Sequence, residues 1–126
     1  MFKDKKGVGN LGEDIAQKYL ENNGYQIITR NWHAGKYGEI DLIATHSSSE
    51  VVFVEVKTRS GLGFGYPEAA VNKSKQIKLR NAAISFTLKY PQLPKNIRFD
   101  VIAIVLGADG QVVDLKHYKN VELQYK

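Results

Sequence analysis

Two short stretches of this chain place carboxylates inside apolar runs, GEIDLIA (38–44) and VVFVEVKTR (51–59). If each stretch is a strand and the residues between them form a turn, antiparallel pairing sets Asp41 opposite Glu55. Directly opposed side chains lie about 5 Å apart, and two carboxylates at that distance destabilise a strand pair unless a cation compensates them. Lys57 follows one pleat further along the same face of its strand.

Two arrangements would satisfy this group. Mg²⁺ or Mn²⁺ is commonly held by one or two carboxylates together with water and phosphate oxygens, and Lys57 is then placed to stabilise charge on a phosphate. Alternatively, Lys57 neutralises both carboxylates in a structural ion-pair network without a metal. Glu13 also has two interpretations. It is either a third acid that points towards the sheet or a first-turn glutamate favoured by the helix dipole.

The basic residues are concentrated in one part of the chain. Residues 57–98 carry nine lysines and arginines against one acidic residue, a net charge of +8, whereas the remainder carries −3. Such a block favours a polyanionic partner, most simply nucleic acid, although a solvated lysine-rich helix face gives the same pattern. The candidate contacts to nucleic acid are Arg59, Lys73, Lys75, Gln76 and Arg80.

Length and composition narrow the class of protein. A chain of 126 residues is close to the commonest single-domain size, so we expect one domain over residues 1–126. The absence of cysteine excludes disulfides and thiolate metal sites and fits a cytoplasmic protein. We find neither the apolar segment of a secretory signal nor an apolar run long enough to span a membrane, and we expect no membrane partner.

Helices and strands must position the candidate site residues, and the sequence pattern predicts these elements in the order αβββαββ. Helices are expected over residues 10–23, where Asn10 can cap and Glu13 can complete a capping box, and over residues 69–90. Strands are expected over residues 25–33, 38–45, 51–58, 97–106 and 112–118. Short turns favour an antiparallel meander of the first three strands, and the second helix allows the fourth strand to join by a crossover. This predicts an α/β fold with a mixed central sheet flanked by helices.

Other features are assigned structural roles. The apolar residues of the second helix predict an inward face made of Ile77, Ala83, Ile84, Thr87 and Leu88. The glycine-rich segment 60–67 lacks the spacing of a phosphate-binding loop and is expected to be a loop beside the site. Asp100 shares a strand face with Arg98, which favours a structural salt bridge. The three histidines have no metal-ligand spacing: His33, His46 and His117.

With these stretches assembled, the chain resembles the PD-(D/E)xK nuclease superfamily and, within it, the YraN-type family of uncharacterised proteins. The segments that carry the resemblance cover nearly the whole domain: LGEDIAQKYLENNGY, RNWHAGKYGEIDLIA, VVFVEVKTR and RFDVIAI. The resemblance implies a restriction-endonuclease-like αβββαβ core. Archaeal Holliday-junction resolvases are among the relatives that this layout suggests, and they imply a homodimer.

The resemblance also implies roles for single residues. Asp41 and Glu55 match the two acidic positions of the motif, Lys57 matches its lysine, and Glu13 matches the helix glutamate of resolvase-like members. Ile40 departs from the motif, because it stands where the superfamily pattern has proline.

The leading hypothesis is a metal-dependent endonuclease that hydrolyses phosphodiester bonds in DNA, including branched or otherwise structured DNA. Asp41, Glu55 and the Val56 carbonyl would hold Mg²⁺ or Mn²⁺, Lys57 would orient the attacking water, and Glu13 would assist. One alternative is a non-catalytic nucleic-acid-binding protein that retains the nuclease fold. Another is a structural or interaction protein whose charges form a solvated face.

Overall fold

The structure is a computed structural model that describes residues 5–47, 49–60 and 73–122, with the backbone alone for residues 5–9 and 73. Its elements follow the predicted order, with one short 3-10 helix added. They are α1 (Lys5–Asn22), β1 (Tyr25–His33), η1 (Gly35–Tyr37), β2 (Glu39–His46), β3 (Glu50–Ser60), α2 (Lys73–Lys89), β4 (Asn96–Leu106) and β5 (Val112–Tyr118). The predicted glycine-rich loop after Ser60 and the predicted helix start at residues 69–72 lie outside the described residues.

Within the described part of the chain, the strands form one mixed sheet in the order β1-β2-β3-β4-β5. Strands β3 and β4 are parallel because α2 carries the chain back between them, and the other neighbours are antiparallel. Leu42 pairs with Val54 and His46 pairs with Glu50, which is the register predicted for the β2–β3 hairpin. The predicted α/β fold, with an αβββαβ core and a mixed sheet flanked by helices, is confirmed.

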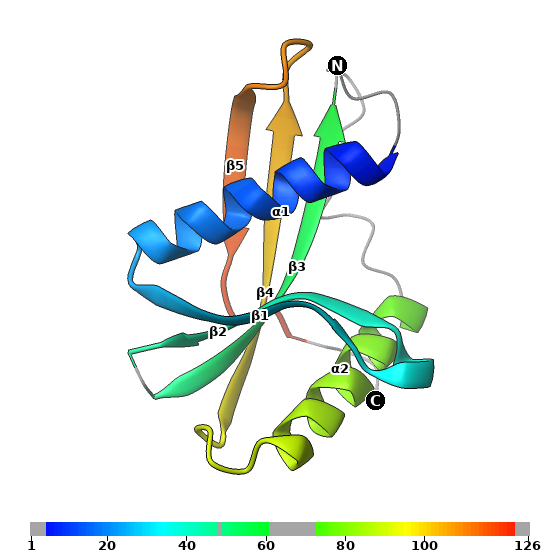
Figure 1. Cartoon of the computed structure of the whole chain (residues 1–126), viewed down its shortest axis with the longest axis vertical. Coiled ribbons are helices and arrows are strands. Elements are labelled where there is room, and N and C mark those ends of the chain that lie inside the picture. The colour runs from blue at the N-terminus through cyan, green and yellow to red at the C-terminus, as the bar shows by residue number, and fades with distance from the viewer. Residues whose placement is uncertain (1–4, 48, 61–72, 123–126) are drawn as a thin grey trace.

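Each helix covers one face of the sheet (Figure 1). Side chains alternate along β3, so Val52 and Val54 pack in the cluster with α1, whereas Val51 and Phe53 pack in the cluster with α2. The apolar run that opens β3 is therefore buried on both faces. Neither helix combines the length and the apolar composition that crossing a membrane requires, as far as the described residues extend.

Helix α1 begins at Lys5, five residues before the predicted start. Asn10 lies inside the helix with an exposed side chain, so the predicted cap at this position is wrong. Asparagine inside a helix costs only about 0.7 kcal/mol relative to alanine, which is too little to end a helix that is otherwise favoured. Glu13 consequently lies more than two turns into α1, beyond the first turn in which the helix dipole favours a carboxylate.

The buried face of α2 differs from the predicted one. Its buried residues have the spacing of a single helical face: Leu79, Ala82, Ala83 and Phe86. Ile84 and Leu88, predicted to point inward, are 39% and 76% exposed, and only Ala83 of the predicted set is buried. Phe86 makes edge contacts with Phe53 and Trp32, with ring centroids 5.7 and 5.2 Å apart. This aromatic packing selects one of the two apolar stripes on the helix.

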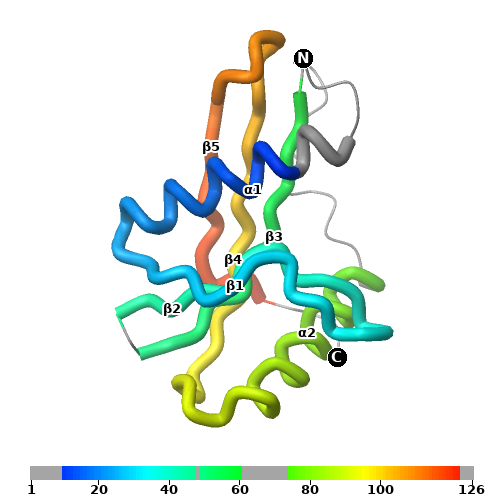
Figure 2. The backbone as a smooth tube through the Cα atoms, in the orientation of Figure 1, coloured from blue at the N-terminus to red at the C-terminus, as the bar shows by residue number. Residues whose placement is uncertain are grey.

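Strands β2 and β3 separate at one end of the sheet. Their pairing runs from His46 and Glu50 to Leu42 and Val54. Beyond that point β3 continues beside β4 as far as Ser60, while β1 and β2 curve away towards η1 and α2 (Figure 2). At this divergence Glu13 of α1 lies close to Asp41 of β2, and Asp41 interacts with Glu55 of β3.

Candidate functional site

Asp41 lies at the divergence, one residue beyond the pairing of β2 with β3. Its Oδ2 accepts a hydrogen bond from the backbone N–H of Val56 at 2.8 Å, which replaces the strand pairing lost at this point. Burial and the negative charge of Glu55 raise the pKa of Asp41 to about 7, although the Val56 N–H favours the ionised form. Asp41 and Glu55 therefore interact as predicted, although the strand pairing expected between them ends one residue earlier, at Leu42 and Val54.

Glu55 is buried, with 4% of its side chain exposed. Its Oε1 lies 3.3 Å from Lys75 Nζ and 3.8 Å from Lys57 Nζ. Its Oε2 is buried and accepts no hydrogen bond from any described residue. A buried acceptor without a donor costs about 1–3 kcal/mol. The protonated form of Asp41 can donate to Glu55, which contributes to the raised pKa of Asp41, but when Asp41 is ionised no described residue donates to Glu55 Oε2.

The packing of α2 explains why Lys75 reaches this carboxylate. Lys75 precedes Leu79 by one turn and lies on the same helical stripe, which faces the sheet. Glu55 lies on the same face of β3 as Phe53, which packs in the cluster with Leu79. The contact that buries Leu79 therefore places Lys75 over Glu55.

Two further carboxylates adjoin Asp41. One oxygen from each of Glu13, Glu39 and Asp41 lies within 4.8 Å of the other two. Burial and the charge of Asp41 raise the pKa of Glu13, while Asn31 and Arg30 act in the opposite direction. Glu39 was not among the site residues predicted from the sequence. The sequence feature that could have predicted its place beside Asp41 is the two-residue spacing of Glu39 and Asp41, which puts both side chains on one face of the strand.

A close contact between α1 and β3 holds Glu13 near this group. A Cβ atom built on Gly12 would lie 1.8 Å from Thr58 Oγ1 and 2.9 Å from Thr58 Cβ. Only glycine permits this approach, and Glu13 is the next residue of α1. Arg30 Nη2 lies 3.5 Å from Glu13 Oε1 and provides a counterion on the β1 side.

The other predicted residues are distributed along β3 and α2. Arg59 is exposed near the end of β3, and Gln76 and Arg80 are partly buried on α2. The side chain of Lys73 lies outside the described residues. The metal-binding role of the Val56 carbonyl and the nucleic-acid contacts of these residues stay predictions. The structure brings together Glu13, Asp41, Glu55, Lys57 and Lys75.

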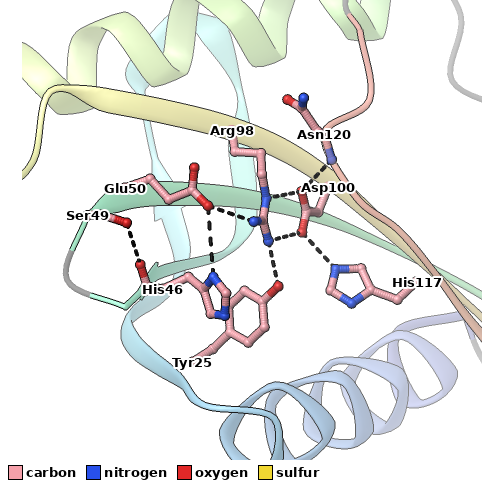
Figure 3. A network of polar contacts seen from close by, with 8 residues as sticks. All are labelled: Tyr25, His46, Ser49, Glu50, Arg98, Asp100, His117 and Asn120. Atoms are coloured by element: carbon pink, nitrogen blue, oxygen red, sulfur yellow. Dashed lines mark hydrogen bonds and ion pairs between the residues drawn. The ribbon is translucent and has the colours of Figure 1, made fainter.

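A second polar cluster surrounds Asp100, which is fully buried (Figure 3). Arg98 donates to its two oxygens at 2.9 and 2.8 Å and to Glu50 Oε1 at 2.6 Å. His117 Nε2 lies 2.7 Å from Asp100 Oδ2, and the Asn120 N–H donates to Oδ1 at 2.9 Å. The predicted salt bridge between Arg98 and Asp100 is confirmed, and His117 belongs to the same network.

The two clusters differ in how completely their carboxylates are paired. Burial alone would raise the pKa of Asp100, but hydrogen bonds with His117, Arg98 and Asn120 hold that pKa below its ordinary value. Both oxygens of Asp100 have partners, whereas Glu55 Oε2 has none among the described residues. The Asp100 cluster has the features of a structural network, and the Asp41 cluster has those of a cation site.

The chain is similar to a family of bacterial proteins. The model described as "Uncharacterised protein family UPF0102" matches residues 12–104, a span that contains the clustered site residues. A UPF0102 protein from Desulforamulus reducens is 45% identical over 117 residues, covering 92% of this chain and 95% of that protein. A UPF0102 protein from Caldicellulosiruptor saccharolyticus is 38% identical over 117 residues, covering 93% and 98%.

A solved structure is also similar. The crystal structure of a repair endonuclease from Pyrococcus abyssi aligns with a TM-score of 0.41 and 13% sequence identity. The alignment covers 85% of this chain and 39% of that protein.

Proposed function

This chain belongs to the uncharacterised protein family UPF0102, and we propose that it is a metal-dependent endonuclease that hydrolyses phosphodiester bonds in DNA, including branched or otherwise structured DNA. The observation that carries the proposal is the pairing of Asp41 with Glu55. The partly buried Asp41, with a pKa raised to about 7, lies beside the buried Glu55, whose Oε2 accepts no hydrogen bond from a described residue.

The donor set fits a hard divalent cation. Carboxylate and carbonyl oxygens are the ligands that Mg²⁺ and Mn²⁺ prefer, and Asp41, Glu55 and the Val56 carbonyl are the proposed ligands. Bound there, such a cation supplies Lewis-acid chemistry towards a phosphodiester. The incomplete pairing of Glu55 supports this assignment, because a cation would satisfy an oxygen that is otherwise costly to bury.

The neighbouring side chains suit the remaining steps of hydrolysis. Lys57 is proposed to orient the attacking water and to stabilise negative charge that develops on the phosphate. Glu13 is proposed to assist by accepting a proton, because burial raises its pKa towards the range in which a carboxylate acts as a base.

The charge pattern supports a nucleic-acid substrate. The chain carries a net charge of +5, and residues 57–98 carry +8. Lysine and arginine contacts to phosphates supply affinity without reading bases, so we expect weak sequence preference and strong salt dependence. The proposed contacts are Arg59, Lys73, Lys75, Gln76 and Arg80.

The test is cleavage of four-way junction, flap and linear DNA by purified protein with Mg²⁺ or Mn²⁺. D41N and K57A are expected to lose activity, while K18A, which removes an exposed charge from α1, is expected to retain it. Cleavage at the wild-type rate by D41N, or the absence of cleavage under every condition, contradicts the proposal.

One observation favours a second candidate function. Both Lys57 and Lys75 reach Glu55, so two ammonium groups already offset part of the buried negative charge. A non-catalytic nucleic-acid-binding protein would use this ion-pair network as scaffold. This second function predicts salt-sensitive DNA binding that persists in EDTA and in the K57A variant. The absence of DNA binding at low salt would instead favour an interaction protein. The predicted homodimer belongs to each of these proposals and is checked by sedimentation velocity.

A further inference from the structure

Two lysines reach Glu55, and the nearer one comes from the helix. Lys75 Nζ lies 3.3 Å from Glu55 Oε1, compared with 3.8 Å for Lys57 Nζ. The side chain of Lys75 is 38% exposed and that of Lys57 is 23% exposed, over a carboxylate that is 4% exposed. Lys75 is therefore both the closer counterion and the one with more access to solvent.

The Lys75 ammonium and a divalent cation compete for the same carboxylate. Glu55 Oε1 is within ion-pair distance of Lys75, and a cation that ligates Glu55 meets a positive charge already paired with it. Like charges repel strongly in a buried site, because the surroundings screen them poorly. The Lys75 ammonium is a compact charge at the end of a flexible four-carbon chain, so it can move while α2 stays packed through Leu79.

We propose that Lys75 is a displaceable counterion of the site. It pairs with Glu55 in the metal-free protein, leaves Glu55 when a divalent cation binds, and then contacts a DNA phosphate beside the site. This inference rests on the function proposed above, because it requires the Asp41–Glu55 pair to bind a cation. Cation binding and phosphate binding are then linked, so each strengthens the other.

The first measurement is the affinity of the DNA-free protein for Mn²⁺ by isothermal titration calorimetry. Lys75→Gln removes the competing charge, and its dissociation constant for Mn²⁺ is expected to be about tenfold lower than that of the wild type. Lys78→Gln removes the same charge from an exposed position on the same helix and is expected to change that constant by less than about twofold. Thermal unfolding checks that both variants fold.

The second measurement is DNA affinity in EDTA and in saturating Ca²⁺. In EDTA, Lys75 stays paired with Glu55 and attracts DNA only through its positive charge. K75Q and K78Q each remove one such charge, so they are expected to lose the same affinity for DNA. In Ca²⁺, K75Q also loses a phosphate contact and is expected to bind about threefold to tenfold more weakly than K78Q.

The possible results distinguish failure of the proposed role of Lys75 from failure of the proposed function. Wild-type protein that binds no divalent cation at millimolar concentration overturns both. Mn²⁺ binding with equal affinity in the wild type and K75Q overturns the inference alone. Equal losses of DNA affinity by K75Q and K78Q in Ca²⁺ overturn the proposed phosphate contact.

Discussion

Asp41 Oδ2 accepts a hydrogen bond from the backbone N–H of Val56 at 2.8 Å, across the point where β2 separates from β3. The carboxylate thus satisfies a main-chain donor that strand pairing no longer satisfies. The same hydrogen bond fixes Asp41 beside Glu55, where burial and the second negative charge disfavour ionisation. Because the pKa of Asp41 rises to about 7, the unfavourable effects outweigh the hydrogen bond.

Asp41→Asn is expected to stabilise the metal-free protein at pH 8, because asparagine keeps an acceptor for the Val56 N–H and removes a partly buried charge. The pKa of Asp41 is raised from 3.8 to about 7, so between these values the folded protein binds a proton that the unfolded chain has released. Wild-type stability therefore falls as the pH rises through this window, and D41N removes that loss. We expect D41N to unfold roughly 5 °C above the wild type at pH 8, with a smaller difference at pH 4.

Circular dichroism melts in EDTA measure this difference. Asp109→Asn is the matched control, since Asp109 is exposed and also accepts a backbone N–H, from Gln111 at 3.0 Å. A lower melting temperature for D41N than for the wild type at pH 8 would contradict the expected cost of burying the Asp41 charge.

Gly12→Ala is expected to move α1 away from β3. The added Cβ meets the side chain of Thr58 at 1.8 Å, and overpacking of this kind costs about 1–3 kcal/mol in the free energy of unfolding. Cleavage is expected to fall as well, because Glu13 follows Gly12 in the helix. Urea denaturation and the junction-cleavage assay measure the two effects.

A double-mutant cycle with Thr58→Gly tests the cause. If the Gly12–Thr58 contact is responsible, G12A costs less in the T58G background than in the wild type, with a coupling free energy of about 1 kcal/mol or more. Additive effects of the two substitutions would show that the added methyl group disturbs α1 in another way.

Arg80→Ala is expected to weaken DNA binding and to lower its salt dependence. If Arg80 contacts one phosphate, removing it reduces the slope of log affinity against log salt by about 1. Lys18→Ala removes an exposed charge from α1 and is expected to leave that slope unchanged. Fluorescence anisotropy at several salt concentrations measures both variants, and equal slopes for R80A and K18A argue against the contact.

The β2–β3 hairpin was predictable because the residues that determine it lie close together in the sequence. The apolar run at Val51–Val54 required burial on both faces, and the short turn set the register that places Asp41 beside Glu55. The helices were less predictable. The sequence of α2 contains two apolar stripes, and the choice between Leu79 and Leu88 depends on the fit of Phe86 against a sheet that forms from distant segments.

The contacts that the sequence analysis missed are long-range. Lys75 was predicted as a DNA contact, but its approach to Glu55 follows from which face of α2 is buried. His117 has no metal-ligand spacing, yet the pairing of β4 with β5 brings it to Asp100. Residue spacing along the chain therefore could not predict either contact.

Leu79→Ala and Leu88→Ala compare the two stripes of α2 directly. Leu79 is 6% exposed and packs against the sheet, so its truncation is expected to lower the free energy of unfolding by about 2–5 kcal/mol. Leu88 is 76% exposed, and the same truncation there is expected to change the free energy of unfolding by less than about 0.5 kcal/mol. Urea denaturation distinguishes these results, and a large effect of L88A alone would favour the originally predicted face.

Arg98→Met is expected to lower the free energy of unfolding at pH 7 by about 3–5 kcal/mol, because it leaves the fully buried Asp100 without its guanidinium partner. The pKa of Asp100 is held below its ordinary 3.8, so the wild-type network stabilises the fold above that pH and loses this contribution as the pH falls through the lower folded-state value. Adding Asp100→Asn removes the charge that has lost its guanidinium partner and is expected to recover part of the loss in R98M. Urea denaturation at pH 7 measures both variants. An R98M protein as stable as the wild type would show that the remaining Asp100 hydrogen bonds are sufficient.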